Sequence, residues 1–161
     1  MSRSPLRLTV LFLGRTREPY LARGIEDFAK RLGHYAHLTL TIIKESSPGR
    51  KVDAGRAMDE GGRRLLSHAP AGALLVALDP KGMQPSSQDL AALLTSWEGQ
   101  GRGHICFLIG GSLGLPAAVL DRCGLILSLS RLTFTHEMAR LLLLEQLYRA
   151  FTIKQGTGYH K

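Results

Sequence analysis

Glycines and hydroxyl-bearing residues follow apolar segments at two places in the second half of the chain. The apolar segment 105–109 ends on Gly110 and Gly111, with Gly114 three residues later, and a second apolar segment, 125–129, leads into residues 130–135. Paired glycines lack Cβ atoms, so backbone N–H and C=O groups there can approach a ligand that side chains would exclude. This spacing indicates a small-molecule site at the ends of strands.

A histidine and an arginine follow directly. His136 and Arg140 are four residues apart at the start of a helical pattern and would share one face of that helix. A histidine can orient or deprotonate a base, and an arginine can bind phosphate or a developing oxyanion. Alternatively, His136 is only a polar residue at a helix start, with Thr133 or Thr135 as the N-cap. The remaining histidines form no metal-ligand grouping, and we expect no metal.

The elements that would position these residues alternate between strands and helices. Near-continuous apolar segments are separated by segments with helical periodicity, a pattern typical of a mostly parallel sheet with helices on both faces. Ligands bind to such sheets at the carboxyl ends of the strands. We expect a single α/β domain over residues 1–161, because no linker or repeat interrupts the pattern. The expected strands cover residues 6–13, 38–43, 73–78, 105–109 and 125–129.

The last predicted helix, about residues 137–154, is apolar on more than one side. Leu141–Leu144 are four consecutive leucines, and Leu147 and Phe151 follow them on the same helix. A helix that is apolar nearly all round needs neighbours on two sides. We therefore expect its own sheet to cover one side and a second protomer to cover the other, in a homodimer.

Charge and cysteine content narrow the choice of partners and location. The net charge is +8, and residues 1–70 carry 13 of the 21 basic but only 7 of the 13 acidic residues. This excess favours a polyanionic partner, although a basic surface that serves only solubility is equally compatible with it. Cys106 and Cys123 lie in apolar surroundings without C-x-x-C spacing, as reduced thiols do. The apolar segment 8–13 is too short for a signal peptide or a membrane span, so we expect a cytoplasmic protein.

The order of these motifs resembles the RlmH-type ribosomal RNA large-subunit methyltransferases of the SPOUT superfamily. The resemblance extends over the whole chain and is densest over residues 105–161. Each motif alone is weak, and it is their order, ending on a Tyr-His pair, that is specific. The matching residues are Leu108–Gly111 with Gly114, Ser130–Thr135, His136, Arg140, Leu147–Ala150 and Tyr159–His160.

The resemblance implies a fold that ordinary topology rules do not predict. Those rules favour an open sheet without a knot, whereas the resemblance implies a C-terminal trefoil knot over about residues 74–161. In the family, the turns after three successive strands form the knot and bind S-adenosylmethionine. Arg131 is expected to point outward from this site. The cofactor-binding residues implied are Leu78, Gly110, Gly111, Gly114, Ser130, Arg131, Leu132, Thr133, Phe134 and Thr135.

The resemblance also implies the reaction, methyl transfer to N3 of a pseudouridine in 23S ribosomal RNA on assembled ribosomes. His136, Arg140, Tyr159 and His160 would be the catalytic residues, with Tyr159 stacking on the target base and His160 hydrogen-bonding to it. Without the resemblance, such a tail would be interpreted as disordered and inert. The chain differs from the pattern common in the family at two points. Thr135 and Glu137, rather than prolines, flank His136, and Gly156–Gly158, rather than Asn-His-Pro, precede the Tyr-His pair.

Two functions of other kinds fit parts of the sequence. A nucleotide- or phosphate-binding α/β protein could use Gly110–Gly114 at a helix N-terminus. The G-x-G-x-x-G and G-x-x-x-x-G-K-[ST] patterns of such proteins are missing, however. A non-enzymatic ribosome-binding factor could use the basic N-terminal half alone.

Overall fold

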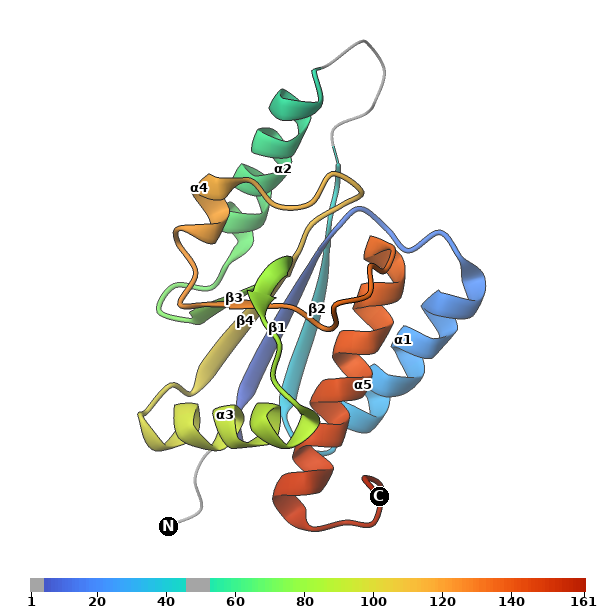
Figure 1. The fold of residues 1–161 in the computed structure, drawn as a ribbon, viewed down its shortest axis with the longest axis vertical. Helices are drawn as coiled ribbons and strands as arrows, with labels where there is room; N and C mark the ends of the chain where they lie inside the picture. Colours follow the sequence, from blue (N-terminus) through green and yellow to red (C-terminus); the bar gives the residue numbers. More distant parts are fainter. Residues whose placement is uncertain (1–4, 46–52) are drawn as a thin grey trace.

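The computed structural model describes residues 5–45 and 53–161, in which strands and helices alternate strictly (Figure 1). This alternation is the one predicted from the apolar segments. The elements are β1 (Arg7–Leu13), α1 (Pro19–Leu32), β2 (His37–Ile43), α2 (Ala54–His68), β3 (Leu74–Met83), α3 (Ser87–Gly99), β4 (His104–Ile109), α4 (Ala117–Leu120), β5 (Leu125–Leu127) and α5 (His136–Gln155).

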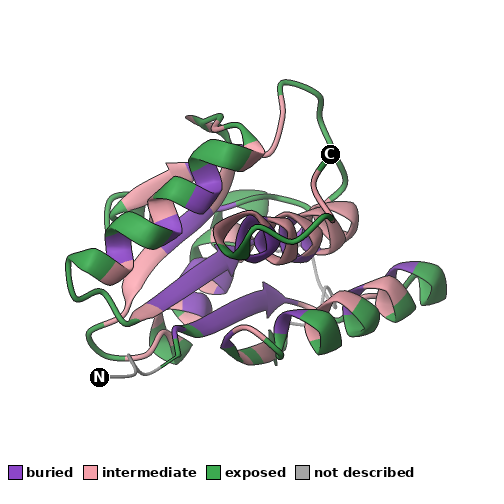
Figure 2. Cartoon of the chain, turned by 90° about the horizontal axis from the view of Figure 1, so that it is seen from below, coloured by how far each residue is buried: buried purple, intermediate pink, exposed green. Residues whose placement is uncertain are grey.

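The five strands form one parallel sheet in the order β2-β1-β4-β3-β5, with helices on both faces. Val10 and Phe107 pack towards α1, α3 and α5, whereas Leu11 and Leu108 pack towards α2 and α4. Successive side chains of a strand point to opposite faces, so a strand covered on both sides must be apolar at every position. The central strands are accordingly buried along their length (Figure 2). The predicted fold class is confirmed.

Close helix packing explains the two glycines in the middle of α2. A Cβ on Gly61 would lie 2.5 Å from the Leu13 side chain, and one on Gly62 would lie 2.6 Å from Pro116. Larger residues would push α2 away from β1 and α4.

β3 is longer than predicted, because it continues past Leu78 to Met83 through a register shift. Both Leu78 and Met83 pair with Leu127, and the Ser128 N–H donates to the Met83 carbonyl at 2.8 Å. Between them, a Cβ on Gly82 would lie 2.5 Å from the Ile126 carbonyl oxygen. The segment after β5 is thus held against the extension of β3 before it continues to α5. Such close crossing of distant segments is what the trefoil knot implied by the resemblance requires.

α5 lies between α1 and α3 on one face of the sheet (Figure 1). Leu143, Leu144 and Leu147 are fully buried within this single chain, and Leu141 packs against Gly24 of α1. The sheet was expected on one side of the leucine run and a second protomer on the other, but two neighbouring helices of the same chain, together with the sheet, cover most of it. The homodimer stays a prediction. None of the helices in the described part of the chain is long and apolar enough to cross a membrane.

We expect Gly82→Ala to lower the free energy of unfolding by about 1–3 kcal/mol, the usual consequence of forcing a methyl group into a closely packed site. The added Cβ would meet backbone, which cannot rotate away. Gly99→Ala is the matched control, because a Cβ at Gly99 meets nothing within 4 Å. Urea unfolding of both variants measures the difference, and equal stability would show that the crossing at Gly82 is not tight.

Candidate cofactor and substrate cavity

One cavity of about 850 Å³ lies at the carboxyl ends of β4 and β5 and beside residues 78–80 in the middle of β3. The sequence placed the ligand here, and the turns after β4 and β5 line the cavity together with the register shift that follows Leu78 in β3. The first helix, which the sequence did not connect with the site, supplies a further wall. Of the predicted cofactor residues, those lining the cavity are Leu78, Gly110, Gly111, Gly114, Ser130, Leu132, Thr133, Phe134 and Thr135.

The glycine turn after β4 has a shape that side chains would not allow. Gly114 has a φ of 81°, a left-handed conformation that strains other residues, and its N–H donates to the Gly111 carbonyl at 3.0 Å. A Cβ on Gly110 would lie 2.7 Å from the Gly114 carbonyl oxygen. A Cβ on Gly111 would instead meet the Glu45 carboxylate. Gly110 and Gly114 therefore shape the turn, and all three glycines offer bare backbone to the cavity.

Short hydrogen-bonded links hold the loop between β5 and α5. The Ser130 hydroxyl accepts from the Leu132 N–H at 2.9 Å, and the Thr135 hydroxyl accepts from the Met138 N–H at 3.2 Å. Thr135 is thus the N-cap of α5, as one interpretation of the sequence proposed. Arg131 is exposed and is the one residue of 130–135 that does not line the cavity, in agreement with the outward orientation expected.

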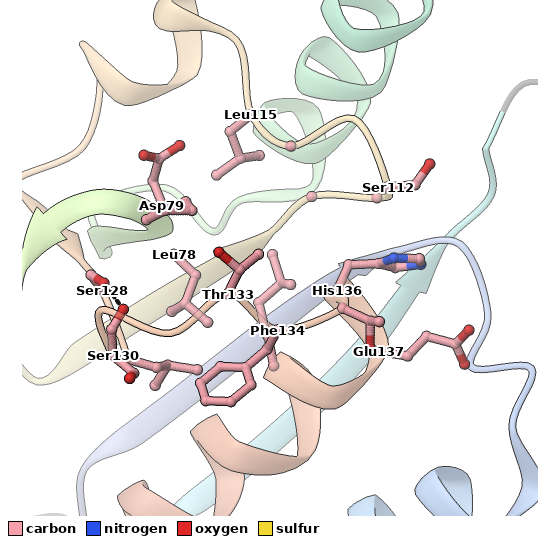
Figure 3. A pocket seen from close by; sticks show the side chains of 18 of the residues that line it. Leu78, Asp79, Ser112, Leu115, Ser128, Ser130, Thr133, Phe134, His136 and Glu137 are labelled. Atoms are coloured by element: carbon pink, nitrogen blue, oxygen red, sulfur yellow. Dashed lines mark hydrogen bonds between the residues drawn. The ribbon is translucent and has the colours of Figure 1, made fainter.

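The cavity is acidic although the protein is basic. Glu18, Asp79 and Glu137 line it, and none of its lining residues within 5–45 and 53–161 is a lysine or an arginine. His136 and Glu137 lie at one end, and Asp79 and Ser130 lie at the other (Figure 3). This arrangement suits a ligand that carries positive charge and an apolar body, and it does not suit a phosphate group.

His136 is the predicted catalytic residue that the structure does place in the cavity. Partial burial, together with the nearby Arg140, lowers the pKa of its imidazole. Its neighbour Glu137 accepts hydrogen bonds from the backbone N–H groups of Arg17 at 2.5 Å and Glu18 at 3.2 Å. Burial alone would raise the pKa of the Glu137 carboxyl, but these two amides outweigh it and lower the pKa. At neutral pH the pair is therefore a neutral imidazole beside a carboxylate.

Arg140 does not reach the cavity, contrary to the role predicted for it. Its side chain is fully buried, donates to the Leu13 carbonyl at 2.8 Å and the Thr16 hydroxyl at 3.0 Å, and lies 4.7 Å from the centre of the Phe12 ring. Its Nε has no hydrogen-bond partner among the described residues. Burial lowers the pKa of this guanidinium. The four-residue spacing correctly predicted that Arg140 lies on the helix near His136. The long arginine side chain, however, turns into the core rather than towards the cavity.

Tyr159 and His160 follow α5 and pack back against side chains of that helix in their own chain, far from the cavity. The Tyr159 hydroxyl donates to Glu145 at 3.1 Å, and Arg149 lies 4.8 Å from the centre of the Tyr159 ring. Burial, and then the Glu145 carboxylate, raise the pKa of the Tyr159 phenol, which stays protonated. At a rise of 1.5 Å per residue, Glu145 and Arg149 are roughly 14–20 Å along α5 from His136. The structure therefore does not bring the tail together with His136 inside one chain.

The contacts of His160 select one form of its ring. Its Nδ1 lies 3.2 Å from an Arg149 guanidinium nitrogen, and its Nε2 lies 3.0 Å from the Gln88 amide. A guanidinium can only donate, so Nδ1 accepts. A proton on Nε2 would then be donated to the Gln88 side chain, with the amide oxygen in the position that the amide nitrogen has in this structure. The tail is ordered by these contacts rather than frayed.

Sequence reasoning missed several lining residues, three of which lie at the start of the first helix. Glu18 and Tyr20 come from the start of this helix. The one local feature of the sequence that could have indicated them is the aromatic side chain of Tyr20, a few residues after the strand that ends at Gly14. Leu115 and Leu127 line the cavity and also belong to the buried core. The residues missed are Glu18, Tyr20, Leu21, Pro80, Ile109, Ser112, Leu115, Leu127, Ser128, Leu129 and Ala139.

The fold and the cavity together define a parallel α/β protein that binds a small ligand on glycine-rich strand ends. The chain belongs to the SPOUT methyltransferase family, since a family model described as a predicted SPOUT methyltransferase matches residues 6–160.

Similar proteins cover nearly the whole chain. A protein of Desulfotalea psychrophila named ribosomal RNA large subunit methyltransferase H is 46% identical, over 94% of this chain and 97% of that protein. One of the same name from Pelotomaculum thermopropionicum is 42% identical, over 95% and 98%. Among solved structures, a probable methyltransferase from Bordetella pertussis has a TM-score of 0.58 at 17% identity, covering 91% of this chain and 96% of that one. The SpoU methyltransferase AviRb from Streptomyces viridochromogenes, solved with AdoMet, has a TM-score of 0.50 at 21% identity, covering 97% and 61%.

We expect Gly114→Ala to weaken S-adenosylmethionine binding by roughly tenfold or more, equivalent to about 1.4 kcal/mol. An alanine in the left-handed region is strained by about 1–2 kcal/mol, and the turn can relieve this strain by moving its amides. Gly72→Ala is the matched control, because Gly72 also has a positive φ, of 77°, with nothing within 4 Å of a Cβ, and lies outside the cavity. Calorimetry measures the S-adenosylmethionine affinity of both variants. Equal affinities would show that the glycine turn is not part of the cofactor site.

Proposed function

We propose that this protein transfers the methyl group of S-adenosylmethionine to N3 of a pseudouridine in 23S ribosomal RNA, acting in the cytoplasm on assembled ribosomal particles. The observation that carries the proposal is the acidic cavity on the glycine turns of a SPOUT chain. The names of the relatives, which are 42–46% identical, support the large-subunit RNA as substrate.

The residues present fit the methyl donor. S-adenosylmethionine, the cofactor of SPOUT methyltransferases, supplies an electrophilic methyl group on a positively charged sulfonium. Bare backbone at Gly110–Gly114 would receive the edge of the adenine, and Leu78, Leu115 and Leu127 would form its apolar floor. The carboxylates of the lining favour a cation, and no side-chain cation of the described lining competes with it.

His136 is the group we propose for proton removal. The N3–H of a pseudouracil ring is a weak acid, and its proton must leave as N3 acquires the methyl group. A neutral imidazole can accept that proton, and the lowered pKa of His136 keeps it neutral at physiological pH. The buried Arg140 would act by positioning the first turn of α5 rather than by touching the substrate.

The tail requires a second protomer if it is to act at the reaction centre. Tyr159 and His160 are held at the opposite end of α5 from His136 by Glu145, Arg149 and Gln88. We therefore propose a homodimer in which the tail of one protomer completes the cavity of the other. Leu132 and Phe134, which are 73% and 38% exposed beside the cavity, are suited to such an interface.

A nucleotide- or phosphate-binding function is less well supported. Phosphate sites use cationic side chains or several converging amides. The described lining has no lysine or arginine and has three carboxylates, which would repel a phosphate.

The methyltransferase proposal is tested most directly by mass spectrometry of 23S RNA from a strain lacking this protein. Loss of one N3-methylated pseudouridine, restored by the purified protein and S-adenosylmethionine, is the expected result, and an unchanged RNA contradicts it.

The rate of methyl transfer should depend on the protonation of His136. Because burial and Arg140 lower its pKa, the rate should rise with pH along a limb centred below the ordinary value of 6.5 and be level at neutral pH. His136→Ala should remove that limb and reduce the rate by about 10²- to 10⁴-fold. Single-turnover rates between pH 5 and 8, with substrate in excess of KM, provide the measurement. A limb that persists in His136→Ala would assign it to another group.

Deleting Tyr159–Lys161 should leave cofactor affinity intact and reduce methyl transfer by about 10²-fold or more. Mixing this truncated chain with a full-length Gly110→Ala chain, whose cavity is distorted, should restore activity that neither has alone, because a mixed dimer contains one intact cavity and one intact tail. Light scattering before and after mixing controls for dimer formation. Full activity of the truncated chain would show the tail to be inert. If the mixed chains form dimers but remain inactive, the tail acts in the cavity of its own protomer.

A further inference from the structure

The cavity has two chemically different walls. The glycine turn and the loop after β5 form one wall, which the proposed cofactor occupies. The other wall consists of Glu18, Tyr20 and Leu21 at the start of α1, together with His136 and Glu137. At about 850 Å³ the cavity lies near the upper end of the roughly 300–1,000 Å³ usual for small-molecule sites. The second wall therefore has room for a second ligand beside the cofactor.

Tyr20 is the prominent feature of the second wall. It is 58% exposed, whereas the adjacent Leu21 is 2% exposed and anchors the helix in the core. The helix start is thus secured, and the phenol ring is presented to the cavity and the solvent. Exposed aromatic rings beside a site are the usual platforms on which proteins stack unpaired bases of RNA.

The wall that carries Tyr20 is rigidly connected to His136. Glu137 holds the backbone of Arg17 and Glu18, and Arg140 holds Leu13 and Thr16. Both residues belong to the first turns of α5, the helix that begins at His136. The backbone just before Tyr20 is therefore held beside the start of α5, which allows an aromatic platform and a proton acceptor to act on one base.

The distribution of charge shows how an RNA nucleotide could be placed here. The carboxylates of Glu18 and Glu137 would repel a phosphate inside the cavity, but they tolerate a neutral base. Arg15 and Arg17 are exposed on the loop between β1 and α1, and the cavity lining does not include them. A nucleotide with its base in the cavity would have its phosphates outside, near this loop.

We propose that Tyr20 is the stacking platform for the acceptor base, an unstacked pyrimidine of RNA, and that Arg15 and Arg17 bind the phosphates on either side of it. This inference rests on the proposed methyl transfer to RNA and adds the place where the RNA enters. It also assigns a function to the N-terminal segment, which the family motifs of the C-terminal half leave without one.

The test compares Tyr20→Ala with Ile42→Ala in binding to large-subunit particles and in methyl transfer. Ile42 is also 58% exposed but lies on β2, outside the cavity. Losing a stacking partner should weaken particle binding and kcat/KM by about 5- to 150-fold in Tyr20→Ala, with kcat changing less than KM. Tyr20→Phe, which keeps the ring, should recover most of the loss. Cofactor affinity measured by calorimetry should stay unchanged, as should particle binding by Ile42→Ala.

The arginines are tested separately by the dependence of binding on salt. Arg15→Gln and Arg17→Gln should each reduce the slope of log K against log salt by about 0.7–0.9, the value for one lost phosphate contact. Tyr20→Ala should leave the slope unchanged, because stacking releases no counterions. Unchanged slopes in both arginine variants would overturn the assignment of phosphates to this loop.

Failure of this inference is distinguishable from failure of the proposed function. If the wild type methylates 23S RNA while Tyr20→Ala binds and reacts as Ile42→Ala does, the base lies elsewhere and the inference is wrong. If light scattering shows that the Tyr20→Ala dimer dissociates, and this alone explains the lost activity, Tyr20 belongs to a protein interface. That result also overturns the inference. If the wild type transfers no methyl group, the proposed function fails, and the binding comparison still decides whether Tyr20 contacts RNA.

Discussion

The arrangement of the site depends on the hydrogen bonds that the buried guanidinium of Arg140 donates. It joins α5 to the end of β1 through the Leu13 carbonyl and to the following loop through Thr16, with the Phe12 ring beside it. A buried cation is tolerated only where hydrogen bonds and a polarisable neighbour compensate for lost hydration, and removal of one partner leaves the charge unpaired. The first turn of α5, and with it His136 and Glu137, is therefore held in one position relative to the sheet.

The contrast between an acidic cavity and a basic chain follows from what each surface must bind. The net charge of +8 can attract a polyanion over a distance, whereas the cavity must hold a cationic cofactor and exclude phosphate. Glu137 serves both purposes, because its carboxylate faces the cavity and is stabilised there by two backbone amides. It needs no arginine partner, and among the described residues the lining has no lysine or arginine.

The sequence was informative wherever function depended on local geometry. Strand ends, the Gly110–Gly114 turn and the Thr135 cap each follow from a few consecutive residues, and the cavity lies where they predicted it. The position of Arg140 was misjudged because it depends on a partner more than a hundred residues away, Leu13. Tyr20 was missed because only the fold brings the start of α1 to the cavity. Gly82 was equally invisible, since only the position of Ile126 shows why a side chain is excluded there.

The central place of α5 has a consequence for how the protein is made. α5 follows every strand in the chain, yet Leu143, Leu144 and Leu147 fill the middle of the face between α1 and α3. Until α5 emerges during synthesis, the apolar surface that it covers on the sheet and those two helices is exposed. Transiently exposed apolar surface of this kind promotes aggregation and attracts chaperones. A nascent chain of this protein should therefore depend on protection until its final helix is available, and it should acquire its ligand site only then.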